Sequence, residues 1–123
     1  MPPPLRLPVQ VRRADDLDLE VRRWESTVEI GGQEGRRAAQ RLKELHRLEA
    51  LFKLKPFFGR HVPQGQIPRI YKARGVTNLF RNDLPDGWRV LHTFVEADGV
   101  QAAILLGAMD HDEYDALFGY RGR

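Results

Sequence analysis

The sequence predicts one α+β domain, in which an N-terminal helical segment packs on a small antiparallel β-sheet. Three observations predict this fold class. A helical spacing of apolar residues extends over about 33–54, strand-like segments joined by short turns follow it, and 123 residues with 41% hydrophobic content supply one core. We expect this domain to span residues 26–120. Residues 1–25, which are proline-rich and then charged, are expected to be a lead-in of unknown role.

The first half of the chain is expected to be mainly helical. Four prolines among the first eight residues exclude a regular helix there, and the charged segment 12–23 is compatible with a short helix. The alternating, β-branched residues 26–30 predict a strand, which the Gly31–Gly32 pair ends. From 33 to about 54 the spacing indicates an amphipathic helix that stops before Pro56, with a two-helix hairpin inside this stretch as the alternative.

The second half is expected to be a β-meander preceded by a loop at 57–68. The predicted strands are 78–81, 88–95 and 100–109. Pro-Asp-Gly and Asp-Gly turn signatures join them, so neighbouring strands should run antiparallel. Asp110 is expected to cap a short final helix that ends at Phe118.

Composition excludes several classes of protein and of site. The chain has no cysteine, which excludes disulfides, thiolate metal ligands and cysteine nucleophiles. No apolar run approaches the ~20 residues of a membrane helix and the start has no secretory signal, so we expect a cytoplasmic protein with no membrane partner. The only serine, Ser26, has no nucleophile-elbow context, and the four histidines lack metal-ligand spacing. We therefore expect no metal and no cofactor.

Charge is unevenly distributed along the chain. The net charge is +3, but residues 36–81 contain twelve Arg and Lys against two acids, whereas the segments on either side are net acidic. A basic middle segment favours polyanionic partners, most simply nucleic acid. The alternative is a solvated basic helix face with no ligand.

Four stretches of the second half follow one another in a characteristic order. They are Asn78–Arg81, the stretch 84–94 with its Gly-Trp-Arg-Val-Leu-His core, the apolar strand 100–109, and the ending His-x-x-Tyr-x-x-x-Phe-Gly-Tyr. This order resembles the RelE/ParE superfamily of toxins from toxin–antitoxin systems over about residues 70–120. The basic helix at 33–54 is similar to the helices that the family places before its meander.

The resemblance implies a RelE-like fold and a toxin of a type II toxin–antitoxin system. Such a protein is a ribosome-dependent mRNA endonuclease that needs no metal, and its partners are the ribosome, mRNA and a cognate antitoxin, for which an apolar groove beside the sheet is expected. The alternatives are a non-catalytic RelE-fold module that binds RNA or protein, and a gyrase inhibitor of the ParE type. The sequence leaves the oligomeric state open.

The resemblance also implies roles for individual residues. Arg89, after the Gly-Trp pair, matches the family's phosphate-binding arginine, and Arg81 matches a basic residue on the preceding strand. Tyr114 and His111 match the C-terminal general base or acid. Further contacts to RNA are implied for Arg37, Arg41, Lys43, Lys72 and Arg74.

One departure from the family pattern concerns charge. Asp110 or His111 stands where the family often has an arginine just after the last strand, and Asp112 and Glu113 are nearby. Acids near the scissile phosphate would oppose RNA binding unless they point away. The surroundings of Arg89 should therefore decide between the hypotheses. A cleft shared with Arg81 and with Tyr114 or His111 favours the nuclease, whereas pairing of Arg89 with a carboxylate favours a binding module.

Overall fold

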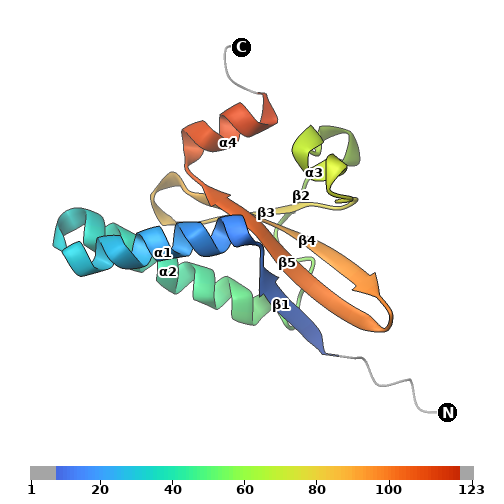
Figure 1. Cartoon of the computed structure of the whole chain (residues 1–123), viewed down its shortest axis with the longest axis horizontal. Helices are drawn as coiled ribbons and strands as arrows, with labels where there is room; N and C mark the ends of the chain where they lie inside the picture. The colour runs from blue at the N-terminus through green and yellow to red at the C-terminus, as the bar shows by residue number, and fades with distance from the viewer. Residues whose placement is uncertain (1–7, 120–123) are drawn as a thin grey trace.

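The computed structural model describes residues 8–119, which form an α+β fold with helices packed on a small five-stranded sheet. The strand order is β1-β5-β4-β3-β2 (Figure 1). The elements are β1 (Val9–Arg13), α1 (Asp15–Ile30), α2 (Gly32–Phe52), β2 (Arg60–His61), α3 (Arg69–Ala73), β3 (Phe80–Asp83), β4 (Arg89–Ala97), β5 (Val100–Met109) and α4 (His111–Phe118). The predicted fold class is confirmed. Most of the proline-rich opening, and Tyr120 of the closing motif, lie outside the described residues.

The N-terminal segment differs most from expectation. The strand predicted at 26–30 is wrong, because these residues are the end of α1. Leu17, Val21 and Trp24 are buried at helical spacing, and their packing outweighs the strand preference of the β-branched residues that follow. The boundary expected at residue 26 falls inside α1, and β1 pairs in parallel with β5 in the same sheet.

Two glycines allow α1 and α2 to form a tight antiparallel hairpin (Figure 1). Gly31 has a φ of 85°, in the region that favours glycine, so the chain reverses within one residue. A Cβ on Gly35 would lie 3.0 Å from the carbonyl oxygen of Thr27, and the two helices therefore approach closely at this point. α2 is the single helix predicted for 33–54, and its hairpin partner is α1.

The predicted meander is confirmed, with its first strand displaced. β3, β4 and β5 pair antiparallel, but β3 begins at Phe80 rather than Asn78. At residue 78 the Asn78 side chain replaces the backbone pairing with β4. Its Oδ1 accepts from the Phe94 N–H and its Nδ2 donates to the Phe94 carbonyl, both at 2.8 Å. Asp98 and Gly99 both have positive φ, as a two-residue turn between β4 and β5 requires.

The sheet separates two apolar clusters. On the helix-covered face, α1 and α2 pack Trp24, Leu45 and Phe52 against the sheet. On the opposite side, which we call the cleft face, α3 and α4 contribute Tyr71 and Tyr114 to a smaller cluster. α4 follows β5 directly and is closed at its start by the predicted Asp110 cap.

Candidate functional site

Strand register gathers basic residues on the cleft face. Arg81 and Asp83 are two residues apart on β3 and so point to the same side of the sheet. Arg89 of β4 lies opposite Asp83, and Arg60 of β2 lies opposite Arg81. Paired residues share a face, so three arginines from three neighbouring strands stand together beside α4.

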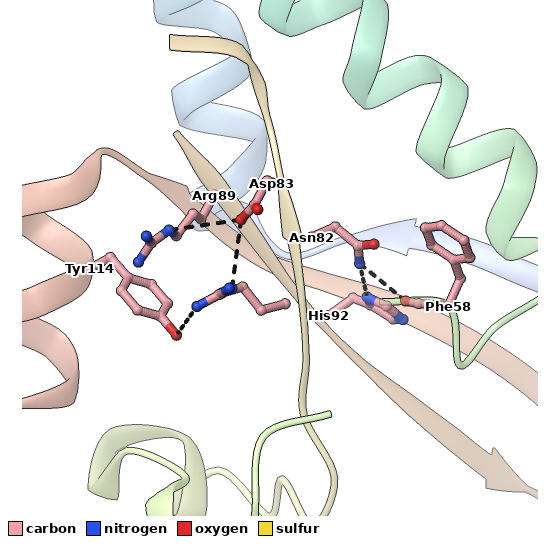
Figure 2. A network of polar contacts seen from close by, with 7 residues as sticks. Phe58, Asn82, Asp83, Arg89, His92 and Tyr114 are labelled. Carbon is pink, nitrogen blue, oxygen red and sulfur yellow. Dashed lines mark hydrogen bonds and ion pairs between the residues drawn. The ribbon is translucent and has the colours of Figure 1, made fainter. Parts of the chain in front are cut away.

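Two of these arginines lie around the ring of Tyr114 (Figure 2). The Arg89 guanidinium carbon is 4.4 Å from the ring centroid, and that of Arg81 is 5.6 Å from it. Arg81 Nη1 donates to the Tyr114 hydroxyl at 3.5 Å. The predicted residues Arg81, Arg89 and Tyr114 therefore converge, and the tyrosine ring holds both cations by cation–π attraction.

A cavity of about 150 Å³ opens beside this cluster. It is lined by Arg60, His61, Val62, Pro63, Gln66, Arg81, Tyr114 and Phe118. None of the described lining residues is acidic, so the cavity presents cations, a phenol, the polar residues His61 and Gln66, and apolar walls. Arg60 is exposed, and no ion pair to a described acid holds it. Arg60 is not recognisable as a site residue from the sequence, because only its place opposite Arg81 identifies it.

Asp83 is the counter-charge of the cluster. Its Oδ1 lies 3.6 Å from Arg81 Nε and 3.8 Å from Arg89 Nε (Figure 2). Both distances exceed a good hydrogen bond, and the Asp83 side chain is 72% exposed. The Arg81 Nε is buried and has no hydrogen-bond partner among residues 8–119. One exposed carboxylate thus bridges two cations loosely and leaves them with a net positive charge that a phosphate can share.

None of the acids at the start of α4 or within it lines the cavity. Asp110 accepts a hydrogen bond from the Glu113 N–H at 2.9 Å, and the Glu113 carboxylate accepts from the Asp110 N–H at 3.3 Å, which is a capping box. His111 does not join the cluster, since its exposed Nε2 lies 3.2 Å from Asp115 on the same helix. The structure therefore selects Tyr114 over His111 as the group at the cleft.

The predicted RNA contacts on α2 divide into exposed and buried residues. Lys43 is exposed, and Arg37 is partly exposed and pairs with Glu34. Arg41 is 6% exposed, and its guanidinium lies against the rings of Trp24 and Trp88, 5.2 and 4.8 Å from their centroids. Burial removes Arg41 from any surface that RNA could reach, so for this residue the prediction is corrected.

The two predicted contacts near α3 are both exposed. Lys72 lies on α3, and Arg74 follows its end, where Arg74 Nη1 lies 3.8 Å from Asp16 of α1. They are outside the residues that line the arginine cavity. They remain candidates for a more distant, salt-sensitive contact with nucleic acid.

A second polar network, on the helix-covered face, has a structural role (Figure 2). His92 is fully buried and its Nε2 lies 2.7 Å from the Pro56 carbonyl, which can only accept, so this nitrogen carries the proton. Asn82 Nδ2 donates to the Phe58 carbonyl at 3.1 Å and lies 3.4 Å from His92 Nδ1. Burial lowers the pKa of His92 to about 4, against the opposing effect of its backbone hydrogen bond. His92 and Asn82 therefore connect Pro56 and Phe58, which follow α2, to the sheet by hydrogen bonds.

The described residues contain no group of three or more His, Asp or Glu side chains placed to hold a metal ion. Within the same part of the chain, no helix is both long and apolar enough to cross a membrane. Comparison of the chain with models of protein families, with curated proteins and with solved structures finds no significant match. The function proposed below therefore rests on the geometry of Arg81, Arg89, Tyr114 and the cavity beside them, and on the sequence resemblance to the RelE/ParE superfamily.

Proposed function

We propose that this chain is a RelE-like toxin of a type II toxin–antitoxin system that cuts mRNA on the ribosome. The observation that carries the proposal is the convergence of Arg81, Arg89 and Tyr114 beside a cavity with no acidic lining among the described residues. The strand order β3-β4-β5 followed by α4 brings them together. A guanidinium group can donate two parallel hydrogen bonds to a phosphate, so a cluster of arginines beside the cavity suits a phosphate ligand.

The proposed reaction is transfer of the scissile phosphate to the neighbouring 2′-oxygen. The 2′-hydroxyl passes its proton to a water molecule and its oxygen attacks phosphorus, while the bond to the 5′-oxygen breaks and that oxygen takes a proton from an acid. The products are a 2′,3′-cyclic phosphate and a 5′-hydroxyl. Arg81 and Arg89 stabilise the negative charge that grows on the phosphorane. The Tyr114 hydroxyl donates a proton to the leaving 5′-oxygen.

The composition of the cleft also supports dependence on the ribosome. The cavity supplies cations and a proton donor, but no carboxylate among its described lining residues to accept the 2′-hydroxyl proton. His61 also lines the cavity, but its ring packs against that of Phe80, with 5.4 Å between the centroids, and Phe80 in turn stacks on His92 of the helix-covered face. The ribosome would then orient the 2′-hydroxyl for attack, and this orientation would compensate for the absence of a carboxylate base in the cavity.

A cognate antitoxin belongs to this proposal, and one surface has the character to receive it. A groove of about 910 Å³ runs between the end of α2, β1 and the outer part of the β4–β5 hairpin. Leu54 and Phe57 are 82% and 57% exposed there, beside Lys53 and Lys55. An inhibitor with apolar and acidic side chains would cover this apolar surface and pair with the lysines.

The second candidate is a binding module without catalysis, which the Asp83 pairing favours. Asp83 touches both Arg81 and Arg89, so part of their charge is neutralised before any ligand arrives. In such a protein the cluster would hold RNA or a protein carboxylate without bond cleavage. The two candidates share the site and differ only in the chemistry that follows binding.

Primer extension on a defined mRNA in a cell-free translation mixture tests the choice. We expect cuts only with ribosomes present, at codon-phased positions, and their loss in Arg89→Ala. Arg12→Ala is the matched control, because Arg12 is an exposed arginine of β1 at the opposite edge of the sheet. Absence of cuts while translation proceeds normally would exclude the nuclease, and retained RNA affinity in that case would support the binding module.

A further inference from the structure

Two clefts of opposite charge lie on the two sides of α4. Tyr114 and Phe118 line the arginine cavity, whereas Glu113 and Leu117 line a second cleft of about 320 Å³ on the side of α1. The charged residues of this acidic cleft are Asp16, Glu20, Arg23 and Glu113. Its apolar walls come from Leu19, Leu106, Gly107, Ala108, Met109 and Leu117. The lining therefore has a net negative charge beside an apolar floor.

A buried phenol without a partner opens into the acidic cleft. Tyr71 is 6% exposed and lines the cleft, and no described residue hydrogen-bonds its hydroxyl. The hydroxyl oxygen lies over the strand, 3.6 Å from the position of a Cβ on Gly107, which also lines the cleft. A polar group that is more than nine-tenths buried and unpaired calls for a ligand or solvent partner.

Glu20 is a second group whose charge is incompletely compensated. Its side chain is 14% exposed, and its nearest cation, Arg23 Nη1, is 3.4 Å away on a side chain that is 64% exposed. Burial raises the pKa of the Glu20 carboxyl, Arg23 opposes this, and the nearby Glu113 adds to it. A further cation would relieve the repulsion between Glu20 and Glu113 and replace the lost solvation.

We propose that the acidic cleft binds an arginine side chain presented by a protein partner. A guanidinium has five N–H donors in a planar fork, which suits two carboxylates and a phenol oxygen arranged around one opening. Its aliphatic stem would lie on the apolar floor formed by Leu106 and Met109. The site is independent of the arginine cleft, and its occupancy does not require that the chain cut RNA.

The test is an amide-resolved NMR titration of the full chain with agmatine and with the peptide acetyl-Gly-Arg-Gly-amide. We expect saturable shifts of the amides in 106–109 and in the first turn of α4. Glu20→Gln should weaken binding about tenfold or more, and Tyr71→Phe by about threefold to fivefold. Glu25→Gln, the same charge change at an exposed position of α1, should leave affinity unchanged.

Three results would overturn the proposal. They are no saturable shift at these amides, an equal loss of affinity in Glu25→Gln, and binding of agmatine without binding of the peptide, which would indicate a small-molecule ligand instead. If Glu20→Gln does not fold, Gly107→Ala serves, because its methyl group would be in ordinary contact with the Tyr71 hydroxyl at 3.6 Å and would narrow the floor. That variant should also weaken both ligands severalfold. Ribosome-dependent cleavage is measured separately and should not change in Glu20→Gln.

Discussion

Both faces of the sheet contain arginines that contact aromatic rings and a carboxylate, but the arginines are buried on one face and accessible on the other. On the helix-covered face, Arg41 lies against two tryptophan rings with Asp86 at 3.5 Å, and only 7% of its side chain is exposed. On the cleft face, Arg81 and Arg89 share one tyrosine ring and Asp83, with 16% and 22% of their side chains exposed. An arginine enclosed by rings has no room for a ligand, whereas an arginine with an open side and a displaceable carboxylate can bind one.

The comparison teaches that residue types alone do not separate a structural cation from a functional one. Burial lowers the pKa of Arg41, and its Nε is buried without a hydrogen-bond partner among the described residues. Its charge is thus held at a cost in solvation that ring contacts and Asp86 offset. Substitutions on the helix-covered face should therefore change mainly the stability, and substitutions on the cleft face should change mainly the proposed activity.

The largest effect is expected at Arg81. Under the proposed nuclease mechanism, Arg81→Ala should lower the rate of ribosome-dependent cleavage about 100- to 1,000-fold, because it removes a cation that would stabilise the charge of the transition state. The denaturation midpoint should change little. Single-turnover cleavage and a urea titration of the same sample measure both quantities. A stability loss as large as the activity loss would contradict the functional role of this face.

Arg41 provides the opposite test. Arg41→Ala should reduce the free energy of unfolding by about 2–3 kcal/mol, because it leaves a cavity beside the rings of Trp24 and Trp88. Arg41→Met fills the space without the charge and should cost about 1 kcal/mol or less. Urea denaturation measures both variants. Equal losses in the two would show that the charge, and not the packing, matters at this position.

The buried histidine should make stability depend on pH. The folded-state pKa of His92 is about 4, below the unfolded value near 6.5, so the unfolded chain binds the proton more readily. The stabilising contribution is complete above pH 6.5 and is lost as the pH falls toward 4, by about 2–3 kcal/mol. Urea titrations at several pH values should show this slope, and His92→Phe should flatten it. An unchanged slope in the variant would assign the pH dependence to carboxylates elsewhere.

A smaller gain is expected at Asp83. Asp83→Asn removes the carboxylate that bridges Arg81 and Arg89, so affinity for single-stranded RNA should rise by about twofold to fivefold, more at low salt. The free energy of unfolding should change by less than about 0.5 kcal/mol, since the side chain is mostly exposed. Fluorescence anisotropy with labelled RNA is the measurement. Weaker binding would mean that Asp83 orients the two arginines for their ligand.

The smallest effect is expected at His111. Its imidazole is exposed and pairs with Asp115 on the outer side of α4, so His111→Ala should change the cleavage rate by less than about twofold. Tyr114→Phe, which removes only the hydroxyl at the cleft, should lower the rate about 10- to 100-fold. The same primer-extension assay compares the two. A large loss in the histidine variant would place the proton donor outside the cavity.

The site could be predicted from the sequence only in part. Arg81, Arg89 and Tyr114 lie in or near a recognisable strand–turn–strand–helix order, and the structure brings all three together. Arg60 could not be predicted, because it follows a glycine in an irregular segment and only pairing of β2 with β3 places it opposite Arg81. The burial of Arg41 could have been predicted from the sequence. Arg41 falls in the same helical spacing as Ala38, Leu45 and Leu48, which are buried, so an exposed side chain is not expected at this position.

The sequence by itself determined the elements whose cause lies within a few residues. These are the period of α2, the Asp98–Gly99 turn with its positive φ angles, and the Asp110 cap of α4. The tertiary structure decided the outcome for residues 26–30, the parallel pairing of β1 with β5, and the separation of buried from open arginines. The reason is that local hydrogen bonds and turn angles act between near neighbours, whereas burial depends on contacts between segments far apart in the chain.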